Sequence, residues 1–393
     1  MPMLTSYRRI LAVPGALRFS LTGLVARLPI SMVGLGIVLL VSAATGSYGV
    51  AGAVSAAYMV ANAILAILQG QLVDRLGQAR VLSFASAGFG VTMVLLIWSV
   101  EGEWPIVTSY VFAALAGASL PQIGSCVRAR WSHVLAAPSE VQTAYALEAV
   151  ADEAVFLLGP ILVTVLATAV HPIAGLVTAI VTGVVGSLAF AAQRSTEPPA
   201  HPHNRSHGPR ARLPWRTVIP LATVCAALGV LFGAAEVTTV AFAEEHGHRP
   251  YAGGLLALWA LGSLLSGVVT GVVRWQRGPT IRVRWGAFAM ACVMVPLYFV
   301  GSIPLLGLAL LVAGIAIAPT MVATLSLTEQ SVPAARLTEG MAIMQTGLVA
   351  GVAPGATISG LVVDHHGASA AYLVSICAGI VAAVAARVLP RAD

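Results

Sequence analysis

Long apolar segments separated by short polar breaks run along the whole chain of 393 residues. A helix needs about 20 apolar residues to cross the ~30 Å hydrocarbon core of a bilayer, so each such segment predicts one membrane span. Cutting at polar and Gly/Pro-rich breaks predicts twelve spans, at residues 17–42, 48–70, 81–100, 105–127, 139–168, 172–192, 216–241, 251–273, 283–301, 304–327, 338–362 and 368–389. The pattern therefore predicts an all-α membrane protein.

A polar segment at residues 193–215, rich in Pro, His and Arg, divides these spans into six and six. It predicts an N-terminal six-helix bundle at 1–192, a polar linker at 193–215 and a C-terminal six-helix bundle at 216–393. We predict no metal site in the linker, because nothing on a polar, flexible segment fixes the geometry of its histidines, His201, His203 and His207.

Composition excludes several other classes of protein. With 58% hydrophobic residues, 9% charged residues and a mean hydropathy of +0.90, the chain lacks the polar surface of a soluble protein of this size. The net charge of +6 comes from arginines scattered between apolar segments, which argues against a nucleic-acid partner. All 21 basic residues are arginine, so a lysine phosphate loop or Schiff base is impossible. We expect no enzyme and no cofactor.

The distribution of charge along the spans predicts the orientation. If the N-terminus is cytoplasmic, all of the 21 arginines except Arg27 and Arg249 fall on the cytoplasmic side. The outer loops then carry acidic residues, Glu101, Glu103, Glu244, Glu245 and Asp364. We therefore expect both termini inside a cell membrane, most simply the bacterial inner or cytoplasmic membrane, with Arg205 accessible only from the cytoplasm. We expect a monomer.

The segment Gly70–Arg80 joins the second and third predicted spans tightly, which predicts an antiparallel hairpin with a charged turn. It reads Gly-x-Leu-x-Asp-Arg-x-Gly-x-x-Arg and resembles the signature between the second and third helices of the major facilitator superfamily. The matching residues are Gly70, Asp74, Arg75, Gly77 and Arg80. Gln78 stands where that family usually carries a basic residue.

This resemblance implies twelve spans in two pseudo-symmetric six-helix bundles around a central cavity, which rock to expose a midplane site to one side and then the other. It also implies a conformational gate. Asp74, beside the arginines of its own loop, is expected to meet the cytoplasmic end of span eleven when the protein faces outward. Gly77 is expected to let the backbone turn closely.

Charged residues within the predicted spans are few. A charge at the bilayer centre costs at least ~2.5 to 3.5 kcal/mol, so one that persists usually faces a cavity or a partner. Glu148 and Asp152 share a helix face, and Arg27 lies at a similar depth. Because the superfamily resemblance implies that spans one and five are neighbours, we expect these three to meet and to couple transport to proton movement, although an ion pair that only holds the bundle together stays an alternative. Two further candidates for proton coupling are Glu153 in span five and Glu236 in span seven.

Small residues and prolines in two spans predict close helix packing and bends. They are Gly159 and Pro160 in span five and Gly351, Pro354 and Gly355 in span eleven. The Gly-Pro pair partly resembles a motif of the drug/proton antiporters of the superfamily. The intramembrane arginine that those antiporters carry in span four is predicted to be missing, because Val107–Ile123 is uncharged and Arg128 and Arg130 are placed at its cytoplasmic end.

Together these features favour a secondary active transporter that exports a small, partly apolar molecule, driven by protons. A proton-coupled symporter that imports a nutrient is the second interpretation; it would need many hydrogen-bonding groups, whereas spans one, four, seven and ten offer mainly Ser, Thr and Gln122. A non-transporting membrane sensor or scaffold is the third interpretation.

Overall fold

The computed structural model describes residues 2–46, 48–200, 212–247, 251–273 and 275–390. The linker histidines and Arg205 lie outside these residues. The regular secondary structure in the described part is helical. Its α-helices are α1 (Pro2–Leu11), α2 (Ala16–Thr45), α3 (Tyr48–Leu76), α4 (Gln78–Glu101), α5 (Ile106–Ser119), α6 (Ile123–Val134), α7 (Pro138–Ala169), α8 (Ala174–Ala191), α9 (Trp215–Glu245), α10 (Ala252–Thr270), α11 (Pro279–Tyr298), α12 (Ile303–Gly314), α13 (Ile317–Ser331), α14 (Leu337–His366) and α15 (Ala368–Val388).

Twelve segments of the described chain are long and apolar enough to cross a membrane, which confirms the predicted fold class. Spans four and ten each consist of two consecutive helices, α5 with α6 and α12 with α13. The first break contains Pro121, which has no amide hydrogen to continue the helix ladder. The sequence pattern did not predict either break, because each span is apolar on both sides of it.

The predicted charged turn is shorter in the structure than in the sequence analysis. Helix α3 continues to Leu76 and α4 begins at Gln78, so Gly77 alone joins them. Its φ of 88° is accessible to glycine at little cost. Residues of the predicted turn therefore lie on helix ends, where their positions are fixed. Helix α1 also precedes the first span, although no helix was predicted there.

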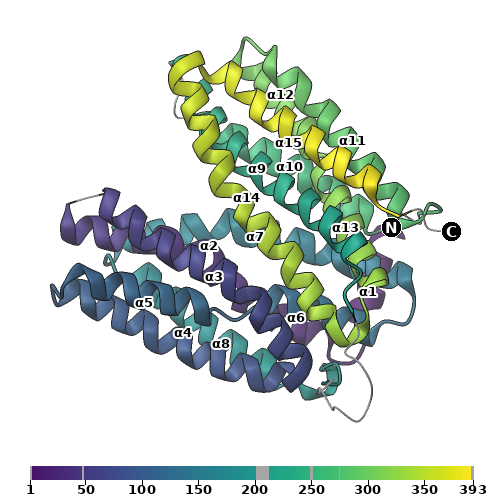
Figure 1. Ribbon diagram of the computed structural model, residues 1–393, viewed down its shortest axis with the longest axis horizontal. Coiled ribbons are helices and arrows are strands. Elements are labelled where there is room, and N and C mark those ends of the chain that lie inside the picture. Colours follow the sequence, from purple (N-terminus) through teal and green to yellow (C-terminus); the bar gives the residue numbers. More distant parts are fainter. Residues whose placement is uncertain (1, 47, 201–211, 248–250, 274, 391–393) are drawn as a thin grey trace.

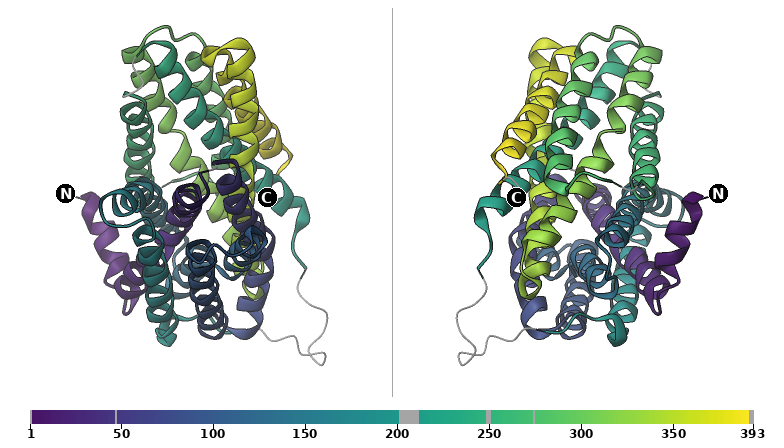
Figure 2. Two further views of the ribbon diagram at one scale, coloured as in Figure 1. Left: turned by 90° about the vertical axis from the view of Figure 1, so that its left-hand side faces the viewer. Right: turned by 90° about the vertical axis from the view of Figure 1, so that its right-hand side faces the viewer.

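The helices form two bundles, α2 to α8 and α9 to α15, as Figure 1 shows. The bundles converge at one end and diverge toward the other. Figure 2 shows the first bundle below the second in both side views. We call the converging end, where Gly77, Arg336 and Arg387 lie, the arginine-rich end. The other we call the acidic end, after its residues Glu101, Glu103, Glu244, Glu245 and Asp364.

Glycines bring pairs of helices close together within each bundle. A Cβ atom on Gly351 or Gly355 of α14 would lie 2.1 Å from a carbonyl oxygen of α9. One on Gly159 of α7 would lie 2.0 Å from the hydroxyl oxygen of Ser31 on α2. Such distances are far below a van der Waals contact, so only glycine permits these approaches. The prolines beside them, Pro160 and Pro354, lie inside helices that continue past them.

Candidate functional site

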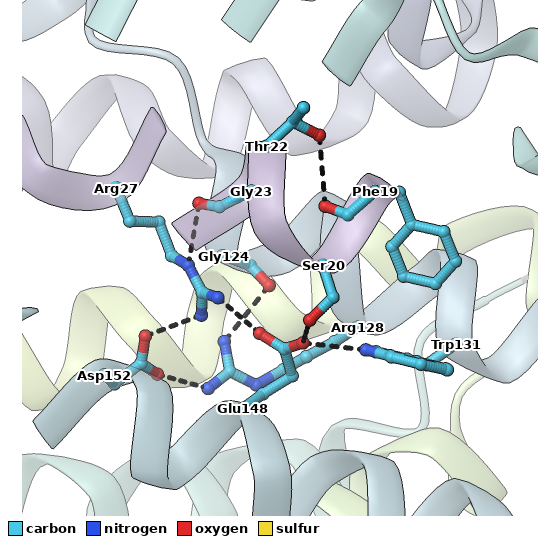
Figure 3. Close-up of polar contacts among 10 residues, drawn as sticks. All are labelled: Phe19, Ser20, Thr22, Gly23, Arg27, Gly124, Arg128, Trp131, Glu148 and Asp152. Carbon is cyan, nitrogen blue, oxygen red and sulfur yellow. Dashed lines mark hydrogen bonds and ion pairs between the residues drawn. The ribbon is translucent and has the colours of Figure 1, made fainter. Parts of the chain in front are cut away.

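A cluster of buried charges lies between α2, α6 and α7 in the N-terminal bundle (Figure 3). Arg27 on α2 donates from Nη1 to Oδ1 of Asp152 at 2.7 Å and from Nη2 to Oε2 of Glu148. Its Nε donates to the carbonyl oxygen of Gly23 at 3.1 Å, which fixes the guanidinium plane. The structure therefore brings together the three side chains that the sequence placed at one depth.

A second arginine completes this cluster. Nη2 of Arg128 donates to Oδ2 of Asp152 at 2.6 Å, and its Nη1 donates to the carbonyl oxygen of Gly124 at 3.1 Å. The prediction that Arg128 lies at the cytoplasmic end of span four was wrong: the span continues to Val134, and the exposed fraction of Arg128 is only 4%. Helix side chains lean toward the N-terminal end of their helix, and for α6 that direction points into the bundle.

The two carboxylates of the cluster differ in their surroundings. Glu148 is fully buried, and its Oε1 accepts from Nε1 of Trp131 at 2.8 Å and from the hydroxyl of Ser20 at 3.2 Å. Phe19 closes over Trp131 with ring centroids 4.6 Å apart. Asp152 bridges both arginines, yet its side chain is 25% exposed. Asp152 is therefore the more accessible carboxylate of the pair.

A small cavity of about 30 Å³, with both polar and apolar lining, adjoins Asp152. A water molecule needs about 10–15 Å³ by this measure, so the cavity has room for about two. Besides Asp152 and the two arginines, its polar lining includes Gln122 on α6's N-terminal side and Gln345 on α14. The cavity thus lies between the two bundles, next to the part of the cluster that is accessible.

Formal charges balance within the cluster. Two arginines face two carboxylates, whereas the sequence analysis counted Arg27 alone. With Arg128 included, both carboxylates have an arginine partner. Protonating either one would break this balance, so a proton can enter only as an arginine contact loosens.

The other predicted coupling residues lie elsewhere. Oε1 of Glu153 accepts from the hydroxyl of Ser263 on α10 at 2.7 Å, so Glu153 faces the opposite bundle. No basic side chain forms an ion pair with Glu153 among the described residues. Glu236 is exposed on α9 and takes no part in the described contacts of the cluster. Of the five candidates, three therefore meet and a fourth touches the other bundle.

The gate predicted at Asp74 joins the two bundles. Oδ1 of Asp74 accepts from the backbone N–H of Thr338 at 3.1 Å, and Oδ2 from that of Glu339 at 2.9 Å. These amides form the first turn of α14, which carries a partial positive charge. The expected contact with span eleven is present. Asp74 makes this contact by capping the N-terminus of α14 through two backbone amides.

Neighbouring residues tighten this contact. Nε2 of Gln71 donates to Oε1 of Glu339 at 3.0 Å, and Nε of Arg336 donates to Oε2 of the same carboxylate at 2.6 Å. A Cβ atom on Gly70 would lie 3.0 Å from Cα of Glu339, so α3 and α14 touch through their backbones. Glu339 is buried at this crossing.

A second set of contacts closes the same end. The hydroxyl of Thr143 on α7 donates to the carbonyl oxygen of Gly271 at 2.7 Å, and Arg282 on α11 donates to Oε1 of Gln142. The hydroxyl of Ser132 donates to Oε1 of Glu329 at 2.8 Å. The conformation described here is therefore closed at the arginine-rich end.

The family model of the Major Facilitator Superfamily matches residues 19–335. The chain belongs to the major facilitator superfamily. A search of curated proteins found no match.

Solved structures of the superfamily share this fold. The human organic anion transporter MFSD10 (TETRAN) has a TM-score of 0.72 and 17% identity, with 98% of this chain and 99% of that chain covered. A bacterial homologue of the iron transporter ferroportin, in an outward-facing state, has a TM-score of 0.75 and 14% identity, with 95% of this chain and 98% of that chain covered. FucP in the outward conformation has a TM-score of 0.72 and 14% identity, with 97% of this chain and 99% of that chain covered. These proteins are transporters rather than enzymes.

The departure of this chain from the superfamily signature at Gln78 has a structural counterpart. Oε1 of Gln78 accepts from Nε of Arg130 at 2.7 Å. Arg130 is fully buried, lies 3.8 Å from the ring centroid of Phe190, and donates to the hydroxyl of Thr196 at 3.0 Å. The positive charge at this place therefore comes from Arg130 on α6. A basic residue at position 78 would repel that guanidinium. The sequence analysis missed this pairing because the two residues lie far apart in the chain.

Proposed function

We propose that this superfamily member exports a small, partly apolar molecule in exchange for protons. The observation that supports this most is the buried, charge-balanced cluster in which one carboxylate, Asp152, reaches a cavity between the bundles. A purely structural ion pair gains nothing from an accessible member, whereas a proton-coupled transporter requires one.

We further propose that the arginine-rich end faces the cytoplasm, because arginines concentrate on that side of bacterial membrane proteins. With this orientation the present conformation is closed to the cytoplasm, and the cluster lies on the outward path. Protons arriving from outside would meet Asp152 and Glu153 before any other buried acid of the N-terminal bundle.

Glu153 is the more direct proton carrier of these two. It lacks an arginine, so it holds a proton without breaking an ion pair, and its hydroxyl partner Ser263 can donate or accept. Protonation of Asp152 instead releases Arg27 and Arg128 from one shared carboxylate. The two steps together would loosen both the cluster and the contact between α7 and α10.

In this closed conformation the cavity holds only about two waters, but the side chains around it favour a partly apolar substrate. Phe156 and Ile30 line it together with the amides of Gln122 and Gln345. Apolar walls with a few placed polar groups are typical of small-molecule sites. The same amides, with Asn62 bonded to Gln122 at 2.8 Å, favour a second candidate function, uptake of a hydroxyl-rich nutrient by proton symport.

Proteoliposomes with a pH-sensitive dye inside test this proposal. Ligands would first be chosen from a chemical panel by thermal stabilisation of the purified protein. For a ligand loaded inside vesicles with the arginine-rich end inward, we expect its exit to drive protons in. Protons that move in together with the ligand would favour symport, and transport without proton movement would contradict coupling. Glu236→Gln, a neutralised acid outside the cluster, is the matched control and should exchange normally.

A further inference from the structure

A groove of about 420 Å³ opens on the outer side of the C-terminal bundle near its arginine-rich end. Helices α10 to α13 form its walls, and Figure 1 shows α11 and α12 on the side of this bundle away from the N-terminal bundle. Its volume lies in the range of ligand pockets, about 300–1,000 Å³. The central cavity and its charged cluster share no residue with it.

The mouth of the groove is basic. Arg277 is exposed and Arg282 is half-buried, and none of the lining residues is acidic. Nη1 of Arg282 donates to Gln142, but its buried Nη2 has no hydrogen-bond partner. A buried guanidinium nitrogen without an acceptor is costly, so this atom favours an anionic ligand with free oxygens.

The rest of the groove is apolar and faces outward. Val312 and Ile315 are 45% and 50% exposed, and Trp285 is 59% exposed. Apolar side chains that are this exposed in a membrane-spanning bundle lie against lipid. Tryptophans such as Trp275 and Trp285, beside arginines, are typical of the boundary between headgroups and hydrocarbon.

We propose that this groove binds an anionic phospholipid. Arg277 and Arg282 hold the phosphate of the headgroup, and one acyl chain follows the apolar wall formed by Val293, Val312 and Ile315. The choice of a lipid rests on the combination of a basic mouth with a lipid-facing apolar wall. Basic pockets between membrane helices recognise anionic headgroups in this manner.

Occupancy of the groove would also affect the conformation. Arg282 lies on the C-terminal bundle, and its other terminal nitrogen already bonds Gln142 of α7 in the N-terminal bundle. A phosphate on Nη2 fixes the guanidinium without displacing that bond. Bound anionic lipid is therefore expected to favour the conformation that is closed at the arginine-rich end.

Native mass spectrometry of the purified protein in detergent tests the site. Phosphatidylglycerol, phosphatidylcholine and inorganic phosphate are added separately, and phosphate is also added in competition. We expect tighter binding of phosphatidylglycerol than of phosphatidylcholine. Each arginine contributes roughly fivefold to affinity for an anionic headgroup, so Arg277→Gln and Arg282→Gln should each lower this preference by about that factor.

Arg387→Gln, which removes an exposed arginine at the same end outside the groove, is the matched control and should keep the wild-type preference. Arg277 is exposed, so its variant reports on binding even if the Arg282 variant folds poorly. Equal binding of the two lipids by the wild type, or an unchanged preference in the Arg277 variant, would overturn the proposal. Displacement of phosphatidylglycerol by inorganic phosphate at matched concentration would likewise assign the site to a free anion.

Discussion

The interiors of the two bundles carry different chemistry. Between α2, α6 and α7 the N-terminal bundle buries Arg27, Arg128 and Glu148 around the bridging Asp152. In the described part of the C-terminal bundle, Glu339 is the buried charged side chain, and it lies at the arginine-rich end. Its interior instead holds hydroxyls. On α13 the hydroxyls of Thr320, Thr324 and Thr328 each donate to a carbonyl oxygen one turn earlier.

We propose that this difference makes the N-terminal bundle the one that responds to protons. Hydroxyls satisfied by their own helix keep the same charge at every physiological pH. Ion pairs change when a carboxylate is protonated, and in the N-terminal bundle they connect three helices. We therefore propose that the N-terminal bundle carries the proton coupling. The C-terminal bundle would move in response, because the contacts of Asp74 and Glu153 connect the two bundles.

The largest effect is expected for Arg27→Gln. It leaves two buried carboxylates with one arginine, and breaking a buried ion pair in this way costs about 3–5 kcal/mol. Proton-coupled transport should be lost and thermal stability lowered. The double variant Arg27→Gln/Glu148→Gln restores the balance of charge and should recover stability but not coupling. Full coupling in either variant, measured in proteoliposomes, would show that the cluster is structural.

A smaller effect is expected for Asp74→Asn. The amide oxygen still accepts one backbone hydrogen bond from α14, but the second bond and the charge at the helix N-terminus are lost. Capping and dipole contributions of about 1–2 kcal/mol predict a five- to thirtyfold shift away from the conformation closed at the arginine-rich end. Accessibility of a cysteine introduced near α14's first turn measures the shift. Asp364→Asn, at the acidic end, is the control that should leave the equilibrium alone.

The smallest effect is expected for Gly77→Ala. At a φ of 88° and a ψ of 152°, a conformation that essentially only glycine adopts, a Cβ atom is strained by about 1–3 kcal/mol, and it would lie 2.9 Å from the Glu197 carboxylate. We expect a lower midpoint of thermal unfolding with transport largely kept. Gly360→Ala is the matched comparison, because nothing lies within 4 Å of that position and its helix is continuous. Equal stability of the two variants would show that the backbone conformation at position 77 does not require glycine.

Hydropathy was sufficient to predict the twelve spans. The meeting of Arg27 with Glu148 and Asp152 needed depth along two spans together with the superfamily resemblance, which implies that spans one and five are neighbours. Arg128 was misplaced because the helix break at Pro121 and the direction of the arginine side chain decide its depth. The pairing of Gln78 with Arg130 depends on how helices pack, and no pattern along the chain encodes it.

Orientation is the prediction on which the direction of transport depends. In a variant whose native cysteines are replaced by serine, a cysteine at Arg387 should react with an impermeant reagent only after cells are opened. A cysteine at Glu101 should react in intact cells. The reverse result would invert the proposed direction of transport and leave the geometry of the cluster unchanged.

The most direct test of proton coupling needs no substrate. Spin labels at Arg80 and Arg387 report the separation of the bundles at the arginine-rich end, and labels at Glu101 and Asp364 report it at the acidic end. For the wild type we predict that acidification lengthens the first distance and shortens the second. In the double variant Asp152→Asn/Glu153→Gln both distances should be independent of pH. A wild-type response that survives in the double variant would contradict the assignment of coupling to these carboxylates.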